Sequence, residues 1–302
     1  MSNYIIETSN LTKKFGKFLA VDQVNLLVPK GGIYGFLGPN GAGKSTTIRM
    51  LLGLIKETKG EVKVFGKSIK EERIAILKRI GSMVETPSYY GHLTAYENLE
   101  VTRKILGTEK IEIDRVLEIV KLTDVRNKAV RKFSLGMKQR LGIAQALLGK
   151  PDLLILDEPT NGLDPSGIIE IRELIKSLPK DYGITILISS HILSEMELMA
   201  THVGIINNGK LLFQGSMDDL RKKQKAVIQL EVEPRADVEM YLKNRGIPYK
   251  ADKRYLYLEP NYQPAKINRE LIINGYAVHQ LMMKKNSLEE IFLSITGKEP
   301  IL

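Results

Sequence analysis

Short runs of apolar residues alternate with helical patterns over the first two thirds of the chain. Each apolar run ends in a turn rich in Gly, Pro, Asp or Ser, and the segments between runs repeat their apolar residues at helical spacing. Apolar strands that alternate with helices are typical of a mainly parallel sheet covered on both faces. Residues 1–215 are therefore predicted to form an α/β unit. Its clearest predicted strands are 32–37, 153–156 and 184–189, and its clearest predicted helices are 46–54 and 136–148.

Two segments depart from this pattern. Residues 88–132 are mostly helical by periodicity, which predicts an α-helical insertion between two sheet elements. After Gly215, apolar and polar residues alternate, which indicates strands with one buried face. Residues 216–302 are therefore predicted to form a small C-terminal α+β domain. Its predicted strands are 226–233, 254–258 and 277–283, and its predicted helices are 237–245, 265–274 and 288–296.

The composition is that of a folded protein without disulfides. The 302 residues are 43% hydrophobic and 26% charged, and none of them is cysteine. The lack of cysteine excludes disulfides and thiolate zinc sites, and it fits the cytosol. No apolar run reaches the roughly 18 to 20 residues that span a bilayer. The N-terminal residues lack the basic and apolar regions of a signal peptide.

The net charge of +10 permits several kinds of anionic partner. Nucleic acid, an anionic membrane surface and nucleotide phosphates all attract a basic protein. Tyrosines are frequent in 216–302, but no basic stripe accompanies them, so no nucleic-acid site is predicted.

A phosphate-binding loop is predicted at residues 38–45, GPNGAGKS. The segment matches G-x-x-x-x-G-K-[ST] and lies between a predicted strand and a predicted helix, which is the context that the motif requires. Glycines let backbone N–H groups turn toward phosphate oxygens, and the helix N-terminus adds a positive dipole end. Lys44 is expected to reach the β- and γ-phosphates, and Ser45 to bind Mg²⁺. The predicted nucleotide-binding residues are Gly38, Pro39, Asn40, Gly41, Ala42, Gly43, Lys44, Ser45 and Thr46.

Two carboxylates follow the apolar run at 153–156. Ligands of α/β proteins bind at the carboxyl ends of the strands. Asp157 is therefore expected beside the Mg²⁺ site, as in phosphate-loop NTPases. Glu158, one residue further on, is the candidate for polarising the attacking water.

The segment FSLGM at residues 133–137 leads into the second predicted helix. Together, the three segments resemble the ATP-binding subunit of an ABC transporter. FSLGM is similar to the signature LSGGQ of that family: Ser134 and Gly136 are retained, whereas Leu135 and Met137 replace a Gly and a Gln. The family's signature caps the nucleotide held by a second subunit, so the resemblance implies a head-to-tail dimer with ATP shared between two copies.

Three further positions extend the resemblance, which covers about residues 4–215. Asp164 ends the segment DEPTNGLD, which resembles the D-loop of the family. His191 ends the segment ISSH, where the family places a histidine on the γ-phosphate. Phe15 lies where the family places an aromatic ring under the adenine. The resemblance implies an ABC ATPase fold that binds ATP and Mg²⁺ and hydrolyses ATP, with Glu158 and His191 as catalytic residues.

Glu85 departs from the family pattern, which has a Gln at that position near the metal and the attacking water. A carboxylate can still bind Mg²⁺, but it adds negative charge beside a polyanion. Glu85 and the surrounding segments resemble the subgroup of bacitracin-transport and lantibiotic-immunity proteins. The resemblance then implies export of, or resistance to, a peptide antibiotic.

The resemblance also implies a membrane partner. Transport requires spanning segments that this sequence lacks, so a separate integral-membrane permease is expected to dock around residues 86–105. The protein is then expected in the cytoplasm, bound to the inner face of the membrane through that permease. The alternative is a soluble ABC ATPase that acts on ribosomes or nucleic acid. The motifs do not distinguish import from export, and they assign no role to residues 216–302.

Overall fold

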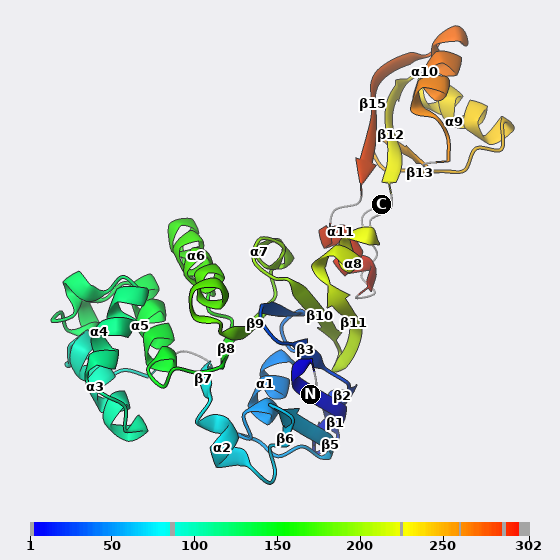
Figure 1. The fold of residues 1–302 in the computed structure, drawn as a ribbon. Coiled ribbons are helices and arrows are strands. Elements are labelled where there is room, and N and C mark those ends of the chain that lie inside the picture. The colour runs from blue at the N-terminus through cyan, green and yellow to red at the C-terminus, as the bar shows by residue number, and fades with distance from the viewer. Residues whose placement is uncertain (1–2, 85–87, 224–225, 260, 286–287, 296–302) are drawn as a thin grey trace. The chain divides into compact units, whose positions relative to one another are not determined.

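The computed structural model describes residues 3–84, 88–223, 226–259, 261–285 and 288–295 (Figure 1). The chain divides into two compact units, Met1–Met217 and Asp218–Leu302, and helix α8 (Met217–Lys222) begins at this boundary. Within the described ranges, no helix is both long enough and apolar enough to cross a membrane.

A six-stranded sheet lies at the centre of the first unit. Its strand order is β11-β10-β4-β9-β8-β7; the strands from β10 to β7 are parallel, and β11 pairs antiparallel with β10. All residues of β4, β8 and β9 are buried, because helices cover both faces of a parallel sheet. The three strands predicted for residues 1–215 are thus confirmed. The bounds are β4 (Ile33–Leu37), β7 (Ile80–Met83), β8 (Leu153–Asp157), β9 (Thr185–Ser190), β10 (His202–Asn207) and β11 (Lys210–Ser216).

A second, antiparallel sheet was not predicted from the sequence. Its strand order is β2-β1-β5-β6, and β3 also pairs with β1. The register of β1 against β2 shifts on both sides of Lys13, so the side chains of β1 do not keep the simple alternation by which a strand is recognised. The bounds are β1 (Tyr4–Phe15), β2 (Phe18–Val24), β3 (Leu27–Pro29), β5 (Lys59–Val64) and β6 (Lys67–Ser68).

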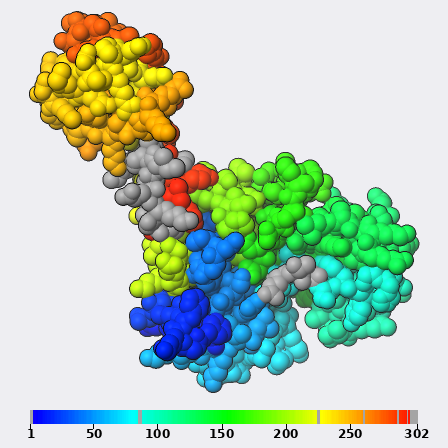
Figure 2. Space-filling view, turned by 180° about the vertical axis from the view of Figure 1, so that it is seen from behind, coloured from blue at the N-terminus to red at the C-terminus, as the bar shows by residue number. Residues whose placement is uncertain are grey.

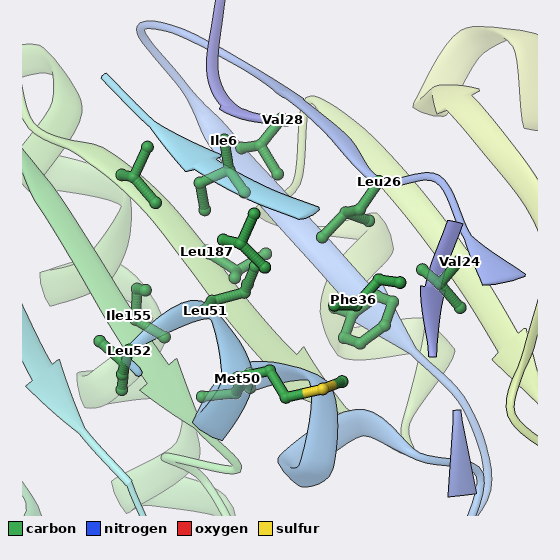
Figure 3. Close-up of a cluster of buried hydrophobic side chains, with 14 of the residues drawn as sticks. Ile6, Val24, Leu26, Val28, Phe36, Met50, Leu51, Leu52, Ile155 and Leu187 are labelled. Carbon is green, nitrogen blue, oxygen red and sulfur yellow. The ribbon is translucent and has the colours of Figure 1, made fainter. Parts of the chain in front are cut away.

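The hydrophobic core of the first unit joins the two sheets through helix α1 (Lys44–Leu51). Met50 and Leu51 of α1 lie among side chains from both sheets, including Ile6 of β1, Phe36 of β4 and Leu187 of β9 (Figure 3). Each large apolar side chain buried in this way contributes about 1.5–3 kcal/mol. The core therefore holds α1, and the loop in front of it, rigidly against the parallel sheet.

Helices make up most of the remaining first unit. The segment 88–132 contains α3 (Ala95–Leu106), α4 (Ile111–Ile119) and two 3-10 turns, Thr123–Val125 and Val130–Lys132. In the space-filling view, the cyan and green atoms of this segment lie together at one end of the unit (Figure 2). Thr94 and Glu97 form a capping box in front of α3. The other helices are α2 (Arg73–Leu77), α5 (Leu135–Leu147), α6 (Pro165–Tyr182) and α7 (Leu193–Glu197).

The second unit is an antiparallel sheet of order β13-β14-β12-β15 with two helices on one face (Figure 1). Leu242 of α9 and Leu271 of α10 are fully buried against Leu230 of β12 and Leu258 of β14. The elements are β12 (Ala226–Glu233), α9 (Arg235–Asn244), β13 (Tyr249–Ala251), β14 (Leu256–Leu258), α10 (Pro264–Ile273), β15 (Ala277–Lys285) and α11 (Leu288–Ile295).

One strand of this unit was not predicted from the sequence. The expected order was β-α-β-α-β-α, whereas the sheet contains the additional edge strand β13. Only three residues form β13, and Lys250 and Ala251 are exposed, so no alternation of buried and exposed positions marks the strand in the sequence.

Candidate active site

The loop before α1 has a backbone that only glycine permits at two positions. At Gly38, a Cβ atom would lie 2.3 Å from the carbonyl oxygen of Ile206. At Gly43, φ is +108° and a Cβ atom would lie 2.6 Å from the carbonyl oxygen of Ala20. The glycines therefore allow the loop to fold tightly between the two sheets and in front of the N-terminus of α1.

Lys44 lies at the start of α1 with only 5% of its surface exposed. Its ammonium nitrogen Nζ donates to the carbonyl oxygens of Gly38 at 2.6 Å and of Pro39 at 3.3 Å. It also forms an ion pair with Oε1 of Glu158 at 3.1 Å. An ammonium group has three N–H donors, so these three acceptors occupy all of them. Phosphate oxygens that bind Lys44 must therefore compete with one of these acceptors.

Asp157 and Glu158 lie at the carboxyl end of β8, next to β9 in the sheet. Asp157 is 6% exposed and accepts a hydrogen bond from the hydroxyl group of Ser189 on β9. The same hydroxyl oxygen accepts from the backbone N–H of Glu158 at 2.9 Å. Glu158 has φ +50°, an uncommon conformation for a residue with a side chain. Ser189 thus helps to hold both acidic residues, a role that the sequence analysis did not assign to it.

His191 follows β9 and lies against Glu158. Its Nδ1 is 2.8 Å from Oε2 of Glu158, so the two carboxylate oxygens of Glu158 contact two different basic groups, Lys44 and His191. Lys44, Asp157, Glu158 and His191 therefore form one cluster at the carboxyl ends of adjacent parallel strands, where ligands of α/β proteins bind.

The signature and D-loop residues lie next to each other. Ser134 caps α5 by accepting from the backbone N–H of Met137 at 3.3 Å, and Leu135 is 41% exposed. A Cβ atom on Gly162 would lie 3.3 Å from Cδ2 of Leu135, so the segment before Asp164 lies against this helix start. Asp164 caps α6 through the backbone N–H of Gly167 at 3.1 Å. The two caps are local to their own helices, and the approach of Gly162 to Leu135 joins the two segments.

The remaining predicted site residues differ in how they are placed. Phe15 is the last residue of β1, pairs with Phe18 across a tight turn, and is 49% exposed, with Nζ of Lys13 4.9 Å from its ring centre. Strand β2 follows this turn and contains Ala20, whose carbonyl oxygen would lie 2.6 Å from a Cβ atom on Gly43. The ring of Phe15 therefore belongs to a hairpin beside the loop at residues 38–45. Glu85 lies outside the described residues. Asn40 and Gly41 are exposed, Ala42 is buried, and Pro39, Ser45, Thr46, Gly136 and Met137 are half-buried or only partly exposed.

The fold and this cluster define the class of the protein. A strand, a glycine loop with a buried lysine, and acidic residues at the end of a neighbouring strand are the parts of a P-loop nucleoside triphosphatase. Residues 21–161 match the ABC transporter family. The chain belongs to this family as an ATP-binding subunit, and it is an ATPase. The α/β fold predicted from the sequence is confirmed.

Sequence relatives that match most of the chain agree with this assignment. The bacitracin transport ATP-binding protein BcrA of Bacillus licheniformis is 49% identical over 298 residues, which cover 97% of each chain. The lantibiotic transport ATP-binding protein SrtF of Streptococcus pyogenes is 46% identical over 214 residues, 71% of this chain and 92% of that one. Among solved structures, an ATP-binding cassette of an ABC transporter in its ADP conformation has a TM-score of 0.66 at 28% identity and covers 72% of this chain and 93% of its own.

Proposed function

We propose that this chain is the ATP-hydrolysing subunit of a membrane transporter whose permease is a separate protein. We further propose that the transporter exports, or confers resistance to, a peptide antibiotic of the bacitracin or lantibiotic type. The contact of Glu158 with both Lys44 and His191 is the observation that carries the catalytic part, because it brings a base, a phosphate-binding cation and a titratable imidazole to one point.

Each residue of the cluster then has a distinct task. Backbone N–H groups of residues 40–46 bind the phosphates of ATP, and Lys44 stabilises their negative charge. Glu158 orients the attacking water and accepts its proton, which requires that the carboxylate leave Lys44. His191 is already near the point of reaction and contacts the γ-phosphate. Phe15 stacks on the adenine ring.

We propose that the site also binds Mg²⁺. The described residues contain no cluster of three or more His, Cys, Asp or Glu side chains that could hold a metal. Mg²⁺ at nucleotide sites is held by one or two protein oxygens, phosphates and water, so a full protein cage is not required. Ser45 and Asp157 would supply the protein oxygens, and Glu85 a third. Bound Mg²⁺ would neutralise charge on the phosphates during hydrolysis.

The signature segment would act on the nucleotide of a second copy of the chain. Ser134 and Gly136 lie at the start of α5, whose positive dipole end favours an anion. Ser134 accepts from the backbone N–H of Met137 in the same helix, and a Cβ atom on Gly136 would lie 3.8 Å from Leu163 of the D-loop segment. A head-to-tail dimer would bring this helix start to the γ-phosphate held by the partner subunit.

A groove in the first unit offers a docking place for the permease. Its volume is about 330 Å³, and β7, α3 and α5 contribute to its walls. Leu106 of α3 lines the groove and is 49% exposed, and Ile105 beside it is 80% exposed. Apolar surface of this kind is typical of protein contact sites. The antibiotic part of the proposal is supported by the names of two relatives, the bacitracin transport ATP-binding protein BcrA and the lantibiotic transport ATP-binding protein SrtF.

The catalytic part is tested by the Glu158→Gln variant. Without the carboxylate, ATP binds but is not hydrolysed, so the ATP-bound dimer should accumulate. Size-exclusion chromatography with light scattering, in Mg-ATP, should show a dimer for Glu158→Gln and a monomer for the double variant with Lys44→Ala. A Glu158→Gln protein that stays monomeric in saturating Mg-ATP would contradict the proposal.

A further inference from the structure

Two contacts join the turn after β8 to the segment after β9. The first joins Glu158 to His191, and it is partly exposed: the Glu158 side chain is 21% exposed and the His191 side chain 36%. The second joins Thr160 to Glu195 of α7, where the hydroxyl group of Thr160 donates to Oε2 of Glu195 at 2.7 Å. Thr160 is 6% exposed and Glu195 7%, so this second contact is buried.

The two contacts respond differently to a nucleotide. Glu158 and His191 both have catalytic tasks under the proposed function, so their mutual contact must break when His191 turns to phosphate and Glu158 to water. Thr160 carries no charge and its hydroxyl is buried, so neither phosphate nor water competes for it. The Thr160–Glu195 contact is therefore the one that persists throughout the reaction.

We propose that Glu195 is a positioning residue, which acts through its buried hydrogen bond with Thr160. This bond holds the turn that carries Glu158 in a fixed position relative to the segment that carries His191. The proposal rests on the catalytic roles proposed above for these two residues.

The local geometry shows how the bond would act. Thr160 is two residues from Glu158 and four from Asp164, and the carbonyl oxygens of Glu158 and Thr160 accept from the N–H groups of Asn161 and Leu163 at 3.1 and 3.2 Å. A displacement of Thr160 therefore moves both the catalytic carboxylate and the D-loop. Glu195 lies in α7 four residues beyond His191, so the bond also limits how far the segment with His191 can move from the carboxylate. A shift of about 1 Å in such a site is enough to lower turnover strongly.

The test compares variants that keep or remove the donor. Thr160→Val has nearly the same shape but no hydroxyl, and Thr160→Ser keeps the hydroxyl. We expect Thr160→Val to lower the kcat for ATP about tenfold and to leave KM within about twofold. The position of Glu158 relative to His191 affects the reaction more than it affects nucleotide binding. Thr160→Ser should restore kcat to within about twofold of the unchanged protein.

Thr185→Val is the matched control for a purely structural effect. Thr185 is also buried, at 3% exposure, and its hydroxyl oxygen accepts from the N–H of Gly31 at 3.0 Å, at the opposite end of β9 from the cluster. Thr185→Val should lower the melting temperature about as much as Thr160→Val does, and it should leave kcat unchanged. The double variant Thr160→Val with Glu195→Met replaces both partners by apolar groups and so should fold well, yet its kcat should stay as low as that of Thr160→Val.

The results separate this proposal from the proposed function. Wild-type kcat in Thr160→Val, with Glu158→Gln inactive, would overturn the positioning role alone. Equal losses of kcat in Thr160→Val and Thr185→Val would also overturn it, because the effect would then be one of stability. Full turnover in Glu158→Gln would overturn the proposed function itself.

Discussion

Neutralising Glu158 is expected to strengthen nucleotide binding while it stops hydrolysis. All three donors of Lys44 have acceptors in the structure, and the acceptor that a phosphate oxygen can replace is Oε1 of Glu158, since the other two are backbone carbonyls of the loop itself. Under the proposed function, ATP binding must therefore break the Lys44–Glu158 ion pair. Glu158→Gln removes the charge that competes for Lys44, so ATP binding no longer has to overcome the ion pair and becomes more favourable.

The size of the effect follows from the ion-pair geometry. At 3.1 Å, two unit charges interact by about 5 kcal/mol at an effective dielectric constant of about 20, which is an upper bound before desolvation. A hydrogen bond to a charged group contributes about 1.5–3 kcal/mol net. Each 1.4 kcal/mol changes a dissociation constant about tenfold, so the Kd for ATP should fall about 10- to 150-fold.

The assay is equilibrium binding of ATP in EDTA, where neither protein hydrolyses it and light scattering can verify that both are monomeric. Two comparisons make the result specific. Glu57→Gln removes another buried carboxylate that pairs with a lysine, Lys70 at 2.6 Å, and should leave the Kd unchanged. In a Lys44→Ala background, Glu158→Gln should no longer tighten binding, because the two effects are coupled. An unchanged or higher Kd in Glu158→Gln would refute the competition between carboxylate and phosphate.

Three further predictions concern other parts of the chain. Gly43→Ala should abolish ATP binding and lower the melting temperature, because a Cβ atom at φ +108° would meet the Ala20 carbonyl oxygen at 2.6 Å; thermal unfolding with and without ATP measures both effects. Phe15→Ala should raise the KM for ATP about 5- to 150-fold through loss of about 1–3 kcal/mol of stacking, but leave the affinity for inorganic tripolyphosphate unchanged, and equal losses for both ligands would contradict the stacking role. Hydrogen bonds from the N–H groups of Tyr255 and Arg254 and from the hydroxyl of Tyr257 lower the pKa of Asp252 in the folded protein. The ionised carboxylate therefore stabilises the fold above its pKa in the unfolded chain, about 3.9, and this stabilisation is lost as the pH falls through the lower pKa of the folded state. In Asp252→Asn, the free energy of unfolding measured with urea should therefore depend less on acid pH.

The sequence predicts those parts of the molecule that are determined by residues close together in the chain. The glycine loop at 38–45 lies between a buried strand and a helix, and this order is visible in the sequence itself. Asp157 and Glu158 follow an apolar run, so their place at a strand end is also local information. The parallel pairing of β4, β8 and β9 follows because fully buried strands need covered faces on both sides.

Other features depend on contacts between distant residues. Ser189 bridges to Asp157 and Glu158 across 31 to 32 positions, and no spacing rule points to it. The Thr160–Glu195 bond spans 35 positions and depends on the packing of α7. The antiparallel sheet around β1 was missed because register shifts break its alternation, and β13 because it is too short to show any.

The central claim, that this ATPase powers a separate permease, is tested most directly by isolating the tagged protein from detergent-solubilised membranes of its own host. The account predicts that an integral membrane protein copurifies and is identified by mass. Leu106→Arg, which places a charge in the groove, should lose that protein, whereas Ile169→Arg on α6, a position with similar exposure, should retain it. Recovery of ribosomal or DNA-bound proteins without any membrane protein would contradict the account.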